Sequence, residues 1–235
     1  MGQKDIFERE LTKNLIVIAD LLNLILFGGK EVILPCDLQI LPGDQTYIDA
    51  NDNLRELRRD RYVLWTKGGV IFAFFGLESQ TVIDPDMPLR GFAYDGNSYR
   101  EQLSNPDGKR YPVLTFVLYF GEKPWTKNLT LSERLQFTPE HADAFKPYFN
   151  DYHVNVIDVR RLKPEDVKKL RSVLRVIATY FYGLDHLNED VLLPPVDTKE
   201  YGTLLALFCK AYLGAEQLDR IPLDKLEIVS STERN

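Results

Sequence analysis

Hydrophobic positions that recur every three or four residues predict helices near both ends of the chain. The first segment of this kind covers residues 5–27 and is ended by Gly28 and Gly29, which suit the left-handed conformation found after many helices. The same spacing predicts a helix over residues 163–183 and a last helix over residues 198–214.

A further helix is predicted in the middle of the chain, over residues 88–103. Pro88 suits the first turn of a helix, because its missing N–H would have no helical partner there. One side of this helix carries mainly apolar residues, which we expect to be buried: Leu89, Phe92, Ala93, Tyr99 and Leu103.

Apolar runs between these helices predict strands. Residues 70–77 carry no polar side chain and are rich in Val, Ile and Phe, which is typical of a strand covered on both faces. The glycines in residues 66–69 suit a tight turn, so residues 61–65 are expected to pair with this strand in an antiparallel hairpin. The remaining segments are residues 111–121 and the shorter 154–159 and 31–34, whereas Asp and Asn residues near position 50 are expected to cap a short helix that ends at Arg58.

This order of elements predicts the fold class. Strands lie in the centre of the sequence, with helices before, between and after them. Such an order is typical of an α/β layered domain and does not fit a helical bundle or a β-sandwich. The paired prolines at residues 194–195 suggest a boundary between a domain over residues 1–194 and a C-terminal helix and tail over residues 195–235.

Polar residues stand directly at the end of the most apolar strand. Glu78 and Gln80 follow Leu77, and their side chains project from the same face because strand side chains alternate. A three-residue hairpin loop, residues 68–70, would place Asp60 opposite Glu78, with Cβ atoms roughly 5 Å apart. Two carboxylates at this separation can share one hard cation. Acids at strand ends are more often simply solvated, and that alternative stays open at this point.

The helix over residues 88–103 carries a polar stripe beside its apolar side. Arg90, Tyr94, Asn97 and Glu101 recur at steps of four, three and four. The Arg90 guanidinium can hold a phosphate oxygen, and the Tyr94 hydroxyl can bind phosphate or an attacking water. The stripe is equally what the solvent-facing side of a half-buried helix shows.

Composition restricts the setting of this chemistry. The chain carries a formal net charge of -6, which argues against a polyanion-binding protein held mainly by surface charge. Its two cysteines lie far apart and form neither a disulfide framework nor a metal-ligand set. No apolar run reaches the roughly 20 residues of a membrane helix. We therefore expect a cytoplasmic, soluble protein that does not enter the membrane.

Several stretches together resemble a known family. Asp60, "GLESQ" with Glu78 and Gln80, "MPLRGFAYD" with Arg90 and Tyr94, and "YPVLTFVLYFG" followed by "KPWT" are similar to the recombination-promoting nuclease and transposase-like family of the PD-(D/E)xK nuclease superfamily. "ADLLNLILFGGKEVI" and "NDYHVNVIDVRRL" resemble the same family, and the stretches cover most of residues 4–180.

The resemblance implies a fold, an activity and a set of site residues. It implies a restriction-endonuclease-like α/β core, in which a helix, an antiparallel strand pair within a mixed sheet and flanking helices precede a helical C-terminal extension. It implies a Mg²⁺-dependent DNA endonuclease linked to recombination or a mobile element, and it allows a homodimer. By resemblance, Asp60 and Glu78 are the metal ligands, and Gln80, Arg90 and Tyr94 complete the catalytic set.

Two departures from the family pattern concern this set. Gln80 stands where many members of the superfamily carry lysine, and Arg59 stands where a proline commonly precedes the first acid. A glutamine can orient a water or a phosphate only by neutral hydrogen bonds. The alternative function is therefore a binding protein that keeps the nuclease fold with weak or no catalysis.

Other polar residues allow two interpretations each. Arg55, Arg58, Arg59 and Arg61 flank Asp60 and can follow a DNA backbone, or they can pair with nearby acids. Asp20 and Asn23 interrupt the apolar side of the first helix, which either places a polar group near the site or serves the packing of that helix.

Overall fold

The computed structural model describes residues 2–48, 54–185 and 198–212. The chain divides into two compact units, one made of residues 39–158 and the other of residues 1–38 with residues 159–235. Each unit is described by itself. Within the described residues, no helix is both long enough and apolar enough to cross a membrane.

The unit of residues 39–158 is built around a mixed sheet. In the described residues its strands follow the order β1 (Leu38–Leu41), β4 (Arg61–Lys67), β5 (Val70–Gln80), β6 (Val113–Tyr119) and β7 (Asn155–Asp158). β4 and β5 are antiparallel, whereas β5, β6 and β7 are mutually parallel. The antiparallel pair within a mixed sheet, together with the helices present in both units, confirms the predicted α/β class.

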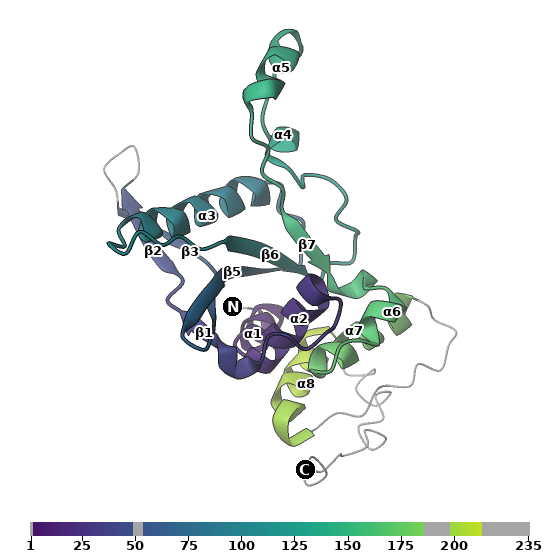
Figure 1. The fold of residues 1–235 in the computed structure, drawn as a ribbon. Helices are drawn as coiled ribbons and strands as arrows, with labels where there is room; N and C mark the ends of the chain where they lie inside the picture. The colour runs from purple at the N-terminus through teal and green to yellow at the C-terminus, as the bar shows by residue number, and fades with distance from the viewer. Residues whose placement is uncertain (1, 49–53, 186–197, 213–235) are drawn as a thin grey trace. The chain divides into compact units, whose positions relative to one another are not determined.

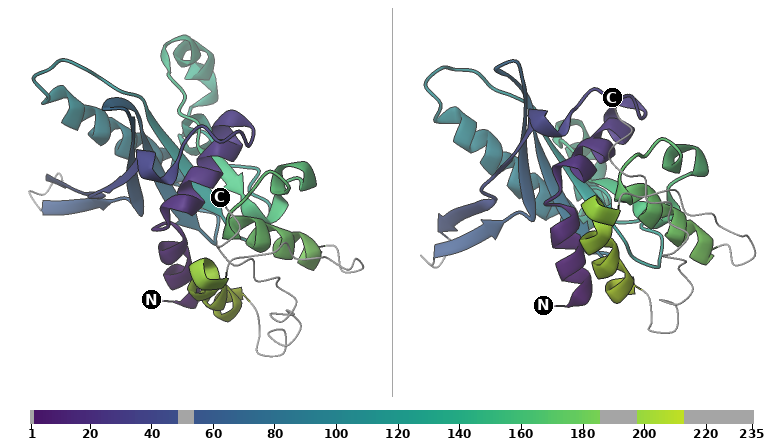
Figure 2. Two further views of the ribbon diagram at one scale, coloured as in Figure 1. Left: turned by 60° about the horizontal axis from the view of Figure 1, so that its bottom comes forward. Right: turned by 90° about the horizontal axis from the view of Figure 1, so that it is seen from below.

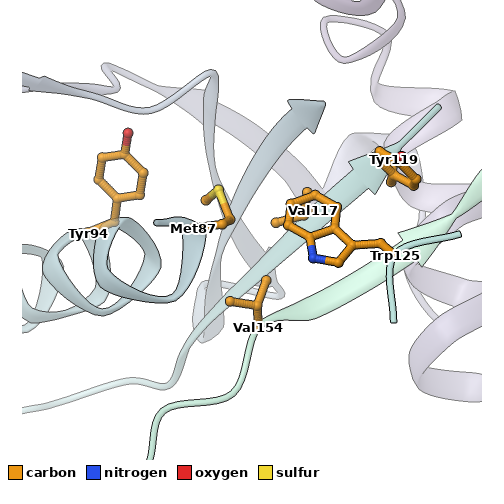
Figure 3. Close-up of a cluster of buried hydrophobic side chains, with 6 residues drawn as sticks. All are labelled: Met87, Tyr94, Val117, Tyr119, Trp125 and Val154. Carbon is orange, nitrogen blue, oxygen red and sulfur yellow. The ribbon is translucent and has the colours of Figure 1, made fainter. Parts of the chain in front are cut away.

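Helix α3 (Met87–Leu103) connects β5 to β6 and lies along one face of the sheet (Figure 1). Met87 and Tyr94 extend from α3 into a buried apolar cluster, and Val117 and Tyr119 belong to β6 (Figure 3). Trp125 and Val154 complete that cluster. The core between α3 and the sheet therefore fixes the helix that carries two of the predicted site residues.

Smaller elements extend from this unit. Strands β2 (Asp44–Ile48) and β3 (Leu54–Arg58) form a separate antiparallel pair. The prediction of a short helix ending at Arg58 is therefore wrong, because this segment pairs as a strand. Between β6 and β7, α4 (Leu131–Arg134) and α5 (Pro139–Phe145) form an arm that points away from the sheet (Figure 1).

The second unit is helical and joins both ends of the chain. Its helices in the described residues are α1 (Gln3–Leu11), α2 (Leu15–Phe27), α6 (Pro164–Val167), α7 (Val173–Asp185) and α8 (Thr198–Tyr212). α8 lies beside α1 (Figure 2), where the ring of Phe208 is 5.4 Å from that of Phe7 and 5.5 Å from that of Phe181. The predicted last helix is thus present, and it packs on α1 and α7.

Three predicted elements of this unit differ in the structure. The helix expected over residues 5–27 is broken, because the side chain of Asn14 accepts hydrogen bonds from the N–H groups of Ile16 and Val17 and caps a new helix there. The helix expected over residues 163–183 is likewise divided into α6 and α7, and residues 31–34 form no strand.

Asp20 and Asn23 have packing roles in this unit. Asn23 accepts hydrogen bonds from the N–H groups of Val32 and Ile33 and donates to the carbonyl of Ile33. Asp20 accepts from the N–H groups of Arg171 and Ser172, just before α7. Of the two interpretations of these residues, the structure supports the second.

Helix α3 is correctly predicted as a helix, but its orientation is the reverse of the expected one. Leu89, Phe92, Tyr99 and Leu103, which were expected inside, are exposed. The buried side instead carries polar residues among small and apolar ones: Met87, Pro88, Gly91, Tyr94, Asp95, Ser98 and Gln102. The polar groups inside have partners, described below, and this satisfies the condition for burying them.

Candidate active site

The register of the β4–β5 hairpin places Asp60 opposite Glu78. Arg61 pairs with Leu77 and Tyr62 with Gly76, so the next pair in the same register is Asp60 with Glu78. The prediction of this register is confirmed for β4 as far as Trp65, which pairs with Ala73. Both carboxyl groups therefore lie at one end of the strand pair.

The loop that produces this register differs from the expected one. Lys67 pairs directly with Val70, so the turn contains only Gly68 and Gly69, both with positive φ. A register shift between Trp65 and Thr66 gives β5 one additional residue and restores the pairing farther along. The predicted three-residue loop is wrong, and the bulge compensates for the missing loop residue.

Asp60 and Glu78 are joined by two reciprocal hydrogen bonds. The N–H of Asp60 donates to Oε1 of Glu78 at 3.3 Å, and the N–H of Ser79 donates to Oδ2 of Asp60 at 2.8 Å. The Glu78 carboxylate thus accepts a hydrogen bond from the N–H of Asp60, and the Asp60 carboxylate accepts one from the residue that follows Glu78. Asp60 is exposed whereas Glu78 is 0% exposed, so one carboxyl group of the pair faces solvent and the other is buried in the unit.

Burial dominates the electrostatics of Glu78. Loss of solvent, followed by repulsion from the nearby Asp60, raises the pKa of Glu78 from 4.5 to about 8, although Arg90 and the Asp60 N–H act in the opposite direction. A buried acid held close to a second acid is typical of a functional site, although structural ion-pair networks can show the same shift.

Arg90 connects Glu78 to a third acid. Its Nη2 lies 3.3 Å from Oε2 of Glu78, and its Nη1 lies 2.7 Å from Oδ2 of Asp84. Nη2 also donates to the hydroxyl of Tyr94 at 3.2 Å. Burial, and then the negative charge of Glu78, raise the pKa of Tyr94, so its hydroxyl keeps its proton. Arg90 and Tyr94, predicted from the polar stripe, are therefore in one hydrogen-bonded group with Glu78.

Asp84 was not predicted from the sequence. It lies in the connection between β5 and α3, six residues before Arg90, and its carboxylate also accepts a hydrogen bond from the N–H of Asp86. An acid just before a helix is usually interpreted as part of a cap, so only its ion pair with Arg90 distinguishes it.

Gln80 is the last residue of β5 and lies on the same face as Glu78. Its backbone carbonyl accepts a hydrogen bond from the N–H of Phe120 at 2.9 Å, which fixes the end of the strand. Its side chain is partly exposed.

Arg59 is buried and does not belong to a DNA-facing surface. Its guanidinium forms an ion pair with Asp95 at 3.0 Å and donates to Oγ1 of Thr115 at 2.9 Å and to Oγ of Ser98 at 3.2 Å. Gly76 leaves the necessary space, since a Cβ there would lie 1.9 Å from Nη1 of Arg59. The interpretation of Arg59 as a contact to the DNA backbone is therefore wrong.

The buried guanidinium of Arg59 also contacts the site. It lies over the rings of Tyr62 and Tyr94, at 5.2 Å and 5.1 Å from their centroids. Arg59 directly precedes Asp60, so the network that holds the guanidinium also fixes the backbone that presents the first acid. The side chains of Arg55 and Arg58 lie outside the described part of the structure.

The ligands for a metal ion at this site are few. Among the described residues, no group of three or more His, Cys, Asp or Glu side chains is arranged to hold a metal ion. A metal at Asp60 and Glu78 would therefore have two carboxylate ligands and complete its shell from water or substrate, which is a common arrangement for Mg²⁺.

Comparison with known proteins identifies the family. No curated protein and no solved structure matches this chain significantly. The family described as "Putative transposase, YhgA-like" matches over residues 3–184, which include every residue of the site, the whole unit of residues 39–158 and part of the other unit. This chain belongs to that YhgA-like family.

Proposed function

We propose that this protein is a Mg²⁺-dependent DNA endonuclease that hydrolyses phosphodiester bonds in recombination or in the movement of a mobile element. The observation that carries the proposal is the carboxylate pair of Asp60 and Glu78, with Arg90 and Tyr94 hydrogen-bonded beside it. Membership in a transposase-like family supports DNA as the substrate.

The chemistry of the two acids fits a divalent cation. Glu78 is buried near Asp60, and their mutual repulsion contributes to the raised pKa of Glu78. A cation would remove this repulsion and favour the ionised form of Glu78. When bound, Mg²⁺ supplies a Lewis acid for a phosphate oxygen and lowers the pKa of a coordinated water.

The remaining side chains supply binding and orientation. Arg90 is held by Asp84 and Tyr94, so its guanidinium is positioned before a phosphate arrives and loses little freedom on binding it. The hydroxyl of Tyr94 can donate to a phosphate oxygen, and the amide of Gln80 can orient a water without adding charge. With no lysine at position 80, more of the charge stabilisation depends on the cation and on Arg90.

One observation favours the second candidate, a binding protein that keeps the fold without turnover. Arg90 already forms an ion pair with Glu78 in the structure, and the described residues provide no third acid in a metal-ligating arrangement. In that case Arg90 would take the place of the cation, and DNA or another partner would bind without being cut.

Nicking of supercoiled plasmid in the presence of Mg²⁺ distinguishes these functions. We expect the wild type to nick the plasmid, and Asp60→Ala to lose at least about a hundredfold in rate, because it removes the exposed ligand of the pair. Asp143→Ala removes the same charge from an exposed position on α5 and should retain activity.

Two results would contradict the endonuclease. One is a wild type that binds no divalent cation in calorimetry and does not nick DNA over a range of metals. The other is nicking that persists unchanged in Asp60→Ala, which would indicate a contaminating nuclease or a different site.

A further inference from the structure

The outward face of α3 is an apolar surface that the described residues leave largely exposed. Leu89 is 41% exposed, Phe92 54%, Tyr99 43% and Leu103 69%. Four large apolar side chains on one side of a single helix exceed the scattered exposure that is normal at a protein surface. The opposite side of the same helix holds the polar groups of the site and of the Arg59 network. A rotation of the helix that buried the apolar face would break those contacts, so this face stays outward.

The spacing along this face is that of a helix–helix seam. Leu89, Phe92, Gly96, Tyr99 and Leu103 follow one another at steps of three, four, three and four, which is the a/d pattern of helices that pack along their length. Gly96, in the centre, is exposed, and a Cβ built there would meet nothing within 4 Å. A glycine at the centre of the seam allows a second backbone to approach closely.

The same pattern is close to symmetric about Gly96, since Leu89 and Leu103 lie seven residues from it and Phe92 and Tyr99 lie four and three residues from it. If a second helix with this sequence lies antiparallel with Gly96 opposite Gly96, each Leu89 is level with Leu103 of the other helix. Each Phe92 is then within one residue, about 1.5 Å along the axis, of Tyr99 of the other helix. We propose that the outward face of α3 pairs with the same face of a second copy of this chain, around a two-fold axis that passes near Gly96. An isologous contact of this kind requires one surface to be complementary to itself, and the seam meets that condition.

The neighbouring positions are compatible with this pairing. In the antiparallel arrangement the exposed Arg100 is level with Phe92 of the second copy and within one residue of its exposed Ala93, so no two like charges face each other along this edge. The rings are also fixed before pairing. Phe92 packs against Tyr152 with centroids 5.8 Å apart, and the hydroxyl of Tyr99 accepts a hydrogen bond from the N–H of Val113. Fixed rings lose less freedom when they are buried.

The size of the seam sets the strength of the dimer. From the exposed fractions, the four apolar side chains offer roughly 350–400 Å² per copy, and hence about 800 Å² in total. Stable protein interfaces bury about 1,200–2,000 Å², and smaller ones are typical of weak or transient complexes. We therefore infer a weak dimer that forms with increasing concentration, or on a substrate that brings two copies together.

Sedimentation velocity of the full chain over a concentration series tests this pairing. Leu89→Glu and Leu103→Lys should each weaken self-association by about tenfold or more, since each puts a charge into the apolar seam of both copies. The combination of the two substitutions should restore association, because the antiparallel register places the new carboxylate opposite the new ammonium of the second copy. Leu135→Glu, at a similarly exposed leucine outside α3, should have no effect.

The register is tested separately by a disulfide across the two-fold axis. In a Cys36→Ser background, which removes the exposed cysteine, Gly96→Cys should form a dimer under mild oxidation, because a disulfide needs Cβ atoms about 3.5–4.5 Å apart. Arg100→Cys is the matched control, since the two copies of this position lie about 12 Å apart along the helix axes.

Three results would overturn the proposal. The first is a wild type that remains monomeric at the highest concentration. The second is a combined variant that associates no better than the single variants, although circular dichroism shows that all of them are folded. The third is cross-linking that is equal at positions 96 and 100, which would indicate random collisions.

Discussion

Glu78 holds its proton more tightly in the folded protein than in the unfolded chain. Its side chain has no solvent contact, and Asp60 adds a second negative charge nearby, so its pKa rises from 4.5 to about 8. Between these two pH values the folded protein binds more protons at this group than the unfolded chain does. Stability contributed by this group must therefore fall as the pH rises through that window.

The direction of this pH dependence gives a measurable prediction in the absence of metal. In EDTA, the free energy of unfolding of the wild type should decrease between pH 4.5 and pH 8 more than that of Glu78→Gln, which cannot ionise. The difference should be a few kcal/mol, because a pKa difference of one corresponds to about 1.4 kcal/mol. Urea denaturation at a series of pH values measures it. Parallel pH profiles for the two proteins would show that Glu78 is not perturbed.

At the level of single residues, the sequence predicts the acids better than the arginines. Alternation and hairpin register were sufficient to bring Asp60, Glu78 and Gln80 to one end of a strand pair. Nothing in "RELRRDR" distinguishes Arg59 from its neighbours. Its burial depends on the space above Gly76 and on Asp95, which is far away in sequence, and a local pattern contains neither.

Among the secondary-structure elements, the contact between the sheet and α3 depends on one buried network. Arg59 precedes β4, Thr115 lies on β6, and Asp95 and Ser98 lie on α3, so a single guanidinium connects three elements. The hydroxyl of Tyr152 completes the network by donating to Asp95 at 2.7 Å. Removing one partner of such a pair leaves a buried charge uncompensated.

Arg59→Met should therefore destabilise the protein strongly. We expect a loss of about 3–5 kcal/mol in the free energy of unfolding, since Asp95 would remain buried without its cation. Arg110→Met, at an exposed arginine, should change stability by no more than about 0.5 kcal/mol. Urea denaturation at neutral pH compares the two. Equal, small losses would show that the network contributes little.

The orientation of α3 shows what periodicity can and cannot predict for an element. A period of 3.6 correctly indicated a helix with two different faces. It did not indicate which face is inside, because the polar face has buried partners and the apolar face does not. The helices expected over residues 5–27 and 163–183 were too long for a similar reason, since apolar spacing continues across an internal cap such as Asn14.

At the scale of the whole molecule, charge and metal should act against each other in DNA binding. The net charge of -6 repels a polyanion. Among the described arginines next to the carboxylate pair, Arg59 is buried, whereas Arg61 and Arg90 keep some exposure. A cation at Asp60 and Glu78 would cancel local repulsion and offer a ligand position to phosphate.

We therefore expect DNA affinity to depend on metal more than on salt. Fluorescence anisotropy with a short duplex should show weak binding in EDTA and stronger binding in Ca²⁺, with a shallow salt slope of about one or two phosphate contacts. Asp60→Ala should lose the effect of Ca²⁺. Tight binding in EDTA with a steep salt slope would instead indicate an extended basic surface elsewhere.

The division into units is the part of the architecture that the sequence did not reveal. The predicted boundary after residue 194 lies outside the described residues. In the sequence, the unit of residues 39–158 stands between the two segments of the other unit. The packing of Phe7 against Phe208 is a contact between the two ends of the chain. Local patterns carry no information about such a pairing, because it depends on which apolar surfaces meet during folding.

The bulge in the β4–β5 hairpin restricts how the length of this hairpin can change without moving the two acids apart. A strand that slips by one residue turns every side chain to the opposite face, so an uncompensated deletion near Phe72 would turn either Asp60 or Glu78 away from the site. A turn that gains one residue keeps Asp60 opposite Glu78 if the bulge is lost at the same time. Two inserted residues, one in each strand, keep the two acids opposite each other without any other change. Keeping both acids on one face therefore requires that the number of residues between Asp60 and Glu78 change only by an even number. The length of the hairpin and the type of its turn can change within that condition.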